Sequence, residues 1–182
     1  MLRSLPENAT LADLRGIYGE LLDHLRPYAE HLMRGPSPLT PGERELIAAY
    51  VSGVNSCRYC YGSHSLLARG FGIDEGVFKN LMDDVDLAPV DPRLKPTLRY
   101  VRKLTETPNR MTEADADAVY QAAWSDGALL HAVAVCADFN NMNRIVEGTG
   151  IVGTAEGYAS GAQRLIAHGY GGTRGDNGFQ VR

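Results

Sequence analysis

The feature that most constrains the fold is a helix without a polar face, predicted over residues 41–54. Thr40, Pro41 and Glu43 give its start signal, because they supply an N-cap, a proline at the first position and the carboxylate of a capping box. After Glu45 the side chains are apolar or small on every side of this helix. A helix of that kind is usually buried, so we expect residues 41–54 to lie inside the molecule.

A second helix is predicted from Cys57 to about Gly70, with Ser56 as its N-cap. It carries the motif C-x-x-C-x-x-x-H, formed by Cys57, Cys60 and His64. On a helix these three side chains share one face, because they are three and four positions apart. We therefore expect the two thiols and the imidazole to point together into the interior or into a narrow pocket.

The rest of the chain also shows helical periodicity and helix start signals. Helices are predicted over residues 11–25, 27–33, 74–82, 112–124, 126–147 and 154–167. A further helix is predicted to start at residues 91–96 and to be broken by the sequence PNR at residues 108–110. No segment alternates convincingly as a strand, and no linker separates two domains. We therefore expect one all-α domain, a helical bundle over residues 1–168 with residues 41–70 as its core motif. Five glycines between residues 169 and 178 predict a flexible C-terminal tail over residues 169–182, or an arm ordered by a partner subunit.

At 182 residues, with 44% hydrophobic and 22% charged residues, the chain has the balance of one globular domain. A net charge of −4 gives no electrostatic footprint for nucleic acid or anionic membranes. No window approaches the roughly 18 apolar residues of a membrane span, and the N-terminus lacks the apolar core of a signal peptide. We therefore expect no nucleic-acid or membrane partner and a cytoplasmic location, where a C-x-x-C is more often redox-active or metal-binding than a structural disulfide.

The motif predicts thiol redox chemistry. Cys57 begins its helix, where the helix dipole stabilises a thiolate and lowers the thiol pKa. Burial should raise the pKa of the Glu45 carboxyl, so that Glu45 and His64 together can accept a thiol proton near neutral pH. The thiolate would attack a peroxide oxygen to give a sulfenic acid, and the second cysteine would condense with it to form a disulfide. An external dithiol would then reduce this disulfide by exchange.

The spacing Glu45, eleven residues, C-x-x-C, three residues, His64 resembles the signature of the alkylhydroperoxidase D and carboxymuconolactone decarboxylase superfamily. The runs DPRLKPTLRYVRKLTETP and DFNNMNRIVEGTGI resemble its peroxidase-related group, and the similarity extends from about residue 39 to residue 152. The resemblance implies an all-helical fold, homo-oligomers (dimers, trimers or hexamers) and thiol-dependent reduction of small hydroperoxides. It also implies Cys60 as the peroxidatic thiol, Cys57 as the resolving thiol, and Glu45 with His64 as a proton relay.

The motif departs from the best-characterised family members at Tyr59, which stands where they have a second histidine. A phenol is a poor base at neutral pH, so we interpret Tyr59 as a packing or pocket-lining aromatic. The roles of the two thiols also conflict: the helix dipole favours Cys57 as the more acidic thiol, whereas the resemblance favours Cys60 as the attacking one. We assign the attack to Cys60, because His64 stands one helical turn beyond it and can act as its base.

Two other interpretations remain open. The C-x-x-C could bind structural zinc with His64 and with Cys136 or His131, although zinc sites usually have a second ligand pair at recognisable spacing. It could also form a disulfide that senses the redox state without turnover. We expect no metal and no cofactor. We interpret Cys136 as a small buried hydrophobe, and Asn140 and Asn143 as residues that cap, pack or pair between helices.

Overall fold

The structure is a computed structural model that describes residues 2–171. Its α-helices are, in chain order, α1 (Leu11–Leu22), α2 (Leu25–Arg34), α3 (Pro41–Val54), α4 (Arg58–Gly70), α5 (Val77–Asn80), α6 (Leu94–Glu106), α7 (Glu113–Gln121), α8 (Asp126–Thr149) and α9 (Ala155–His168). Two 3₁₀ helices, η1 (Val85–Leu87) and η2 (Pro108–Arg110), complete the elements of this part of the chain, which contains no strand. None of these helices is both long and apolar enough to cross a membrane. The prediction of an all-α fold is confirmed.

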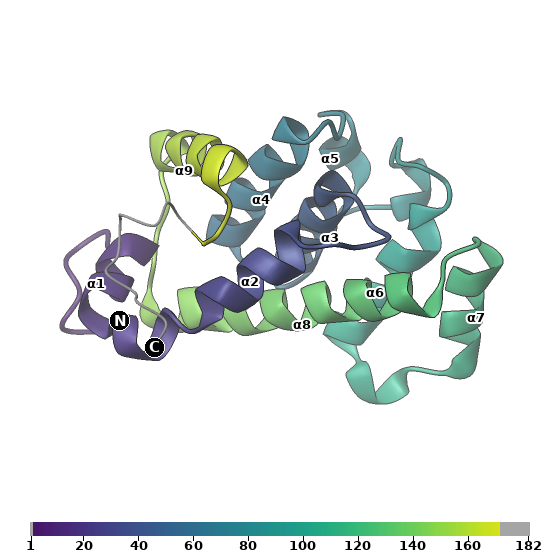
Figure 1. Cartoon of the computed structure of the whole chain (residues 1–182), viewed down its shortest axis with the longest axis horizontal. Coiled ribbons are helices and arrows are strands. Elements are labelled where there is room, and N and C mark those ends of the chain that lie inside the picture. Colours follow the sequence, from purple (N-terminus) through teal and green to yellow (C-terminus); the bar gives the residue numbers. More distant parts are fainter. Residues whose placement is uncertain (1, 172–182) are drawn as a thin grey trace.

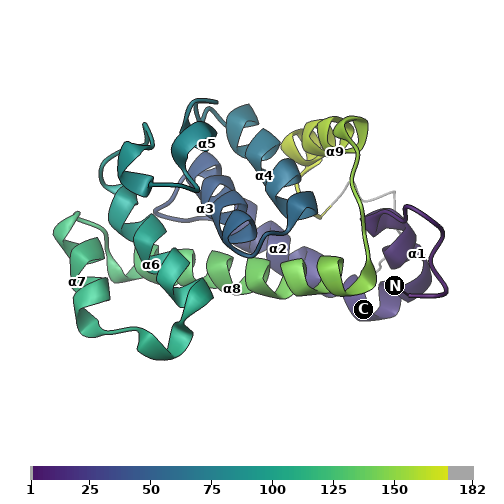
Figure 2. The same cartoon turned by 180° about the vertical axis from the view of Figure 1, so that it is seen from behind.

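The helix α3 lies at the centre of the molecule. It packs against α4, α8, α6 and α2, and α8 runs beside these helices along the longest axis (Figure 1; Figure 2). Every residue of α3 from Arg44 to Ser52 is buried, which confirms the predicted buried helix. Its N-terminus carries the expected capping box: the Thr40 N–H donates to the Glu43 carboxylate at 2.6 Å, and the Glu43 N–H donates to Thr40 Oγ1 at 3.2 Å.

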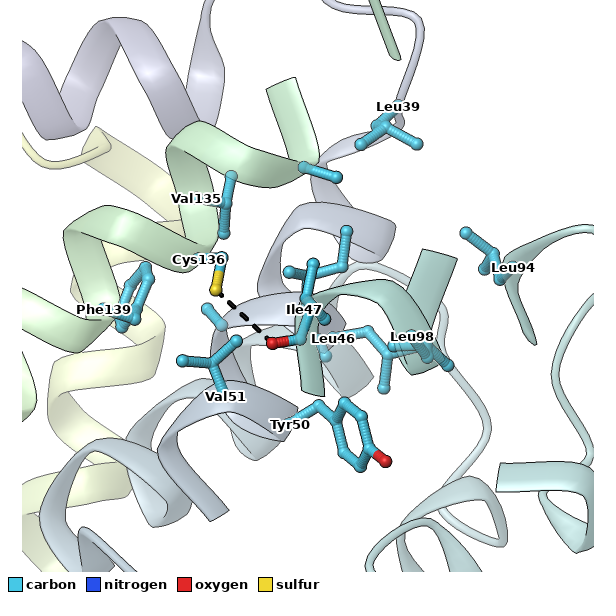
Figure 3. Packing of buried hydrophobic residues seen from close by; sticks show 14 of the residues in the cluster. Leu39, Leu46, Ile47, Tyr50, Val51, Leu94, Leu98, Val135, Cys136 and Phe139 are labelled. Atoms are coloured by element: carbon cyan, nitrogen blue, oxygen red, sulfur yellow. Dashed lines mark hydrogen bonds between the residues drawn. The ribbon is translucent and has the colours of Figure 1, made fainter. Parts of the chain in front are cut away.

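The main hydrophobic core forms where α3, α6 and α8 meet (Figure 3). Val51 of α3 and Leu98 of α6 are 0% exposed there, and full burial of such a side chain stabilises the fold by about 1.5–3 kcal/mol. Cys136 of α8 is 1% exposed, and its thiol donates a weak hydrogen bond to the Val101 carbonyl at 3.6 Å. The interpretation of Cys136 as a small buried hydrophobe is confirmed, and burial raises the pKa of its thiol.

The start of α4 differs from the prediction. Its N-cap is Cys57 and not Ser56. Ser56 adopts a left-handed conformation with φ of 58°, whereas an N-cap residue needs an extended backbone. The Cys57 N–H donates to the Ser52 carbonyl at 2.9 Å. This tight turn folds α4 back against α3 and places the first cysteine in the interior.

The two N-terminal helices also divide differently from the prediction. The helix α1 ends at Leu22 and not near Leu25, and α2 begins at Leu25 and not at Pro27. Pro27 is tolerated because it lies in the first turn of α2, where a backbone N–H has no intrahelical partner.

The chain after α9 returns to α2. The backbone N–H groups of Tyr170 and Gly171 donate to the Glu30 carboxylate, and the Arg26 guanidinium donates to both of their carbonyls. The first residues of the predicted tail are therefore held on α2, and residues 172–182 lie outside the described residues.

Candidate active site

The helices α3 and α4 bring the four predicted site residues into one buried region. Glu45 of α3 is 0% exposed and His64 of α4 is 7% exposed, and Glu45 Oε2 lies 2.6 Å from His64 Nδ1. On α4, Cys57 and Cys60 are 0% and 3% exposed, and both are free thiols. Glu45 thus pairs with His64, and the dithiol faces the interior, as the helical spacing predicts.

Glu45 has two further partners that sequence reasoning missed. Arg34 of α2 donates to Glu45 Oε1 at 2.7 Å, and the hydroxyl of Tyr170 donates to the same oxygen at 2.9 Å. The Arg34 guanidinium also lies over the rings of Phe71 and Tyr170, at 4.5 Å and 5.0 Å from their centroids. The signal that could have prompted a search for them is the burial expected of Glu45, because a buried carboxylate requires a cation or several hydrogen-bond donors.

The partners of Glu45 keep it ionised. Burial raises the pKa of the Glu45 carboxyl, but His64 and Arg34 together outweigh burial, so that the pKa lies below its usual value. The expectation of a raised pKa is therefore wrong, because the sequence did not reveal the pairing with Arg34. An ionised Glu45 accepts the hydrogen bond from His64 Nδ1–H, which leaves Nε2 as the free acceptor of the ring. Glu45 thus orients His64, and the imidazole is the proton acceptor of the pair.

The two thiols form a hydrogen-bonded pair in which Cys57 is the more acidic. The Cys60 thiol donates to the Cys57 sulfur and lowers the pKa of Cys57, against the opposing effect of burial. The same contact, together with burial, raises the pKa of Cys60 far above its usual value. These directions agree with the helix-dipole argument for Cys57. Of the two thiols, Cys57 is therefore the one that loses its proton more readily.

A polar network from α8 holds the dithiol in place. Asn143 Nδ2 donates to Ser52 Oγ at 3.0 Å, and Asn143 Oδ1 accepts from Asn55 Nδ2 at 2.9 Å. Cys57 and burial raise the pKa of Cys60, and the Asn143 side chain opposes them through a hydrogen bond to the Cys60 sulfur. The predicted pairing of Asn143 between helices is confirmed, and its contact with the thiol is a feature that sequence reasoning missed.

A cavity of about 130 Å³ reaches Cys60 and His64 between α1, α2, α8 and α9. Tyr59 and Tyr158 line it, with their rings in edge-to-face contact at 5.8 Å, which confirms the interpretation of Tyr59 as pocket-lining. Cys57 does not line this cavity, so Cys60 is the sulfur that a small molecule in the cavity would meet. A wider groove of about 580 Å³ between α1 and α8 contains none of these side chains.

Asp138 of α8 is a further titratable group of the cavity, which sequence reasoning did not single out. It is 7% exposed, and burial raises the pKa of its carboxyl to about 6, with His64 opposing the shift. The neighbouring Phe139 packs edge-on against the His64 ring at 4.3 Å between centroids. His64 is thus held between Glu45 on α3 and these two residues of α8.

Within residues 2–171, no three His, Cys, Asp or Glu side chains come together as ligands for a metal ion. The two residues that could have completed a zinc site have other contacts. His131 Nε2 lies 2.7 Å from the Leu32 carbonyl, and Cys136 Sγ lies 3.3 Å from Thr105 Oγ1. The zinc interpretation therefore has no support in the arrangement of the described side chains.

Residues 19–103 match the model of the Carboxymuconolactone decarboxylase family, and this stretch contains Glu45, Cys57, Cys60 and His64. No curated protein matches the chain.

Two solved structures share the fold. An uncharacterized peroxidase-related protein from Silicibacter sp. TM1040 is 28% identical, with a TM-score of 0.73, over 80% of this chain and 78% of that chain. An uncharacterized peroxidase-related protein from Ralstonia eutropha JMP134, described as an alkylhydroperoxidase core, is 24% identical, with a TM-score of 0.75, over 82% of this chain and 79% of that chain. Together with the buried C-x-x-C, histidine and glutamate, these similarities support the expected resemblance to the alkylhydroperoxidase D-like and carboxymuconolactone decarboxylase superfamily.

Proposed function

We propose that this protein is a thiol peroxidase that reduces small hydroperoxides with its Cys57/Cys60 dithiol. The observation that carries the proposal is the cavity, which ends on Cys60 and His64, while a second thiol lies against Cys60 and a buried carboxylate orients His64. Peroxide reduction by a thiol requires access to one sulfur and a base that takes its proton. The similarity to a protein described as peroxidase-related supports the same class of reaction.

The first step activates Cys60 and cleaves the peroxide. The Cys60 proton passes to His64 Nε2, one helical turn further along α4, which makes His64 an imidazolium and leaves the Cys57 thiolate free for the second step. The Cys60 thiolate then attacks the terminal oxygen of R–O–O–H, and the O–O bond breaks. The attacked OH group stays on sulfur as the sulfenic acid. The alkoxide that leaves takes a proton from the His64 imidazolium and becomes the alcohol.

The second step forms the disulfide. Cys57, as a thiolate, attacks the sulfenic sulfur of Cys60, and hydroxide leaves and is protonated to water. An external dithiol then reduces the disulfide by two exchange reactions through a mixed disulfide. In each cycle two electrons from that dithiol reduce one hydroperoxide to one alcohol and one water.

Stoichiometry tests the proposal. The reduced protein should consume tert-butyl hydroperoxide with the loss of two thiols per peroxide, measured by a ferrous-iron peroxide assay and by thiol titration of the denatured protein. Cys60→Ser should abolish this consumption. Cys136→Ser is the matched control and should leave it unchanged, because Cys136 is buried in the core and does not line the cavity.

Two results would contradict the proposal that this protein is a thiol peroxidase. Consumption by Cys60→Ser at the rate of the unmodified protein would remove Cys60 from the mechanism. A disulfide that forms once, with no further peroxide consumed when dithiothreitol or dihydrolipoamide is supplied, would favour a redox-sensing protein of the same fold.

We further propose that the protein works as a homo-oligomer in the cytoplasm. An apolar surface beside α1 supports an assembly, because Leu2, Tyr18 and Leu21 are 39%, 38% and 76% exposed and line the same groove. A reducing compartment supplies the dithiols that the cycle needs. Light scattering at micromolar concentration should give a mass above that of one chain, and a single monomeric species would refute the assembly.

A further inference from the structure

Two arginines line the cavity that reaches Cys60, and neither pairs with a carboxylate. Arg15 belongs to α1 and Arg164 to α9, two helices that lie at the same end of the molecule in both views (Figure 1; Figure 2). The ion pairs within residues 2–171 include neither guanidinium. The Arg15 Nε atom is buried and has no hydrogen-bond partner in this part of the chain. A buried guanidinium N–H without an acceptor is costly, and it indicates a site for an anion.

The charges around Arg15 are mainly positive. Burial lowers the pKa of Arg15, the guanidinium groups of Arg26 and Arg164 lower it further, and Asp23 and Tyr59 act in the opposite direction. Like charges gathered at a cavity raise the local concentration of ions of the opposite sign. An anion between Arg15 and Arg164 would supply the acceptor that Arg15 Nε lacks.

Tyr59 connects this positive region with the reactive thiol. Burial and Cys60 raise the pKa of the Tyr59 phenol, whereas Arg15 and Arg164 lower it. Tyr59 is adjacent to Cys60 in the chain and lines the same cavity as both arginines. An anion held by the arginines would therefore occupy the cavity that also contains Cys60.

The acidic group of the cavity, Asp138, belongs to α8, whereas the two arginines belong to α1 and α9. Asp138 interacts electrostatically with His64, Tyr28 and Tyr170, and it is not among the groups that shift the pKa of Arg15. The electrostatic partners of Asp138 are thus different from those of Arg15. The walls of the cavity also include apolar side chains, among them Leu11, Val146 and Leu165.

We propose that Arg15 and Arg164 bind a carboxylate, and that the substrate is a compact organic hydroperoxide that carries one. The guanidinium fork matches the geometry of a carboxylate and can hold both of its oxygens. The cavity of about 130 Å³ favours a small molecule, because drug-sized ligands occupy roughly 300–1,000 Å³. The hydroperoxide part of this assignment rests on the proposed function, and the carboxylate part does not.

The test uses a compact, redox-inert carboxylate, 3,3-dimethylbutanoate, with 3,3-dimethylbutanamide as its neutral counterpart. Calorimetric titration of the reduced full chain should show the carboxylate binding about tenfold more tightly than the amide, the effect of one charge-assisted contact. Arg164→Gln and Arg15→Gln should each weaken carboxylate binding by about tenfold and leave amide binding unchanged. Arg164 is exposed, so its replacement should not disturb the fold, and Arg110→Gln, also exposed and outside the cavity, is the matched control.

Three results would overturn the inference: equal affinity for carboxylate and amide, unchanged carboxylate binding in Arg164→Gln, or tighter binding of inorganic phosphate than of the carboxylate. The bound carboxylate should also inhibit consumption of tert-butyl hydroperoxide competitively, raising KM with kcat unchanged. If the protein binds the carboxylate as expected but consumes no hydroperoxide, the proposed function fails and the carboxylate site stands.

Discussion

Replacing Glu45 with glutamine tests the buried charge on which the site depends. The substitution keeps the shape of the side chain and removes its charge. The carboxylate contacts Arg34 at 2.7 Å and His64 at 2.6 Å, and Glu45 itself is 0% exposed. Glutamine can still accept hydrogen bonds from Arg34 and Tyr170 through its amide oxygen, but its NH₂ group then faces His64 Nδ1.

The contacts set the expected loss of stability. Breaking a buried ion pair costs about 3–5 kcal/mol. Because the amide oxygen retains one acceptor and Arg34 is 13% exposed, we expect Glu45→Gln to lower the free energy of unfolding at pH 7 by about 2–3 kcal/mol. That change corresponds to a fall in Tm of about 5–10 °C for a chain of this length.

The loss should depend on pH in a defined way. The folded-state pKa of Glu45 lies below its ordinary value of 4.5. The stability that the ionised carboxylate contributes is therefore fully present above that value and is lost as the pH falls through the folded pKa. Urea unfolding of both proteins should show a constant difference from pH 6 to pH 8 and a difference that shrinks below about pH 4.5. Glu106→Gln, which breaks an exposed pair with Arg102, is the control and should cost less than about 1 kcal/mol.

We also expect Glu45→Gln to lower the rate of peroxide consumption strongly. The glutamine NH₂ group donates to His64 Nδ1, which forces the ring proton onto Nε2 and removes the acceptor that takes the thiol proton. We expect the rate of peroxide consumption to fall by about 10²–10⁴-fold. A difference in unfolding free energy below about 0.5 kcal/mol at pH 7 would refute the buried ion pair. An unchanged rate would refute the role of Glu45 in orienting His64.

Two other substitutions probe neighbours of this pair. Tyr170→Phe removes the hydroxyl that donates to Glu45 at 2.9 Å. Urea unfolding should show that it lowers the free energy of unfolding by about 1–2 kcal/mol. The control is Tyr100→Phe, which should change the free energy of unfolding little because the Tyr100 hydroxyl does not contact Glu45. Asp138→Asn should stabilise the protein at pH 8 by up to about 3 kcal/mol. Since burial raises the pKa of Asp138 from 3.8 to about 6, the unmodified protein loses stability as the pH rises through this window. The gain should therefore disappear below pH 4, and a gain that persists there would rule out titration of Asp138 as its cause.

The part of the site that the sequence predicts depends on the spacing of residues that are close together in the chain. The capping box of Thr40 and Glu43 fixes where α3 begins, and three- and four-residue spacing puts Cys57, Cys60 and His64 on one face of a helix. Glu45 meets His64 because α3 and α4 are consecutive and a tight turn folds one against the other. Each of these features depends on residues close together in the chain.

The unpredicted part comes from distant segments. Arg34 reaches Glu45 from α2, Asn143 reaches the dithiol from α8, and Tyr170 arrives from a glycine-rich end that has no helical pattern. Periodicity shows which face of a helix is buried, but it does not show which side chain of another helix meets that face. For that reason burial alone predicted the wrong direction for the pKa of Glu45. The left-handed backbone of Ser56 was missed for a different reason, because serine is a common N-cap residue.

The central claim is that Cys60, the thiol that lines the cavity, attacks the peroxide although Cys57 is the more acidic thiol. Trapping the sulfenic acid tests it most directly. Cys57→Ser lacks the resolving thiol, so the sulfenic acid should persist long enough to react with dimedone. After one equivalent of tert-butyl hydroperoxide, peptide mass spectrometry should find the dimedone adduct on Cys60 in Cys57→Ser and none on Cys57 in Cys60→Ser. An adduct on Cys57 in Cys60→Ser, with Cys60 unmodified in Cys57→Ser, would contradict the account and assign the attack to the more acidic thiol.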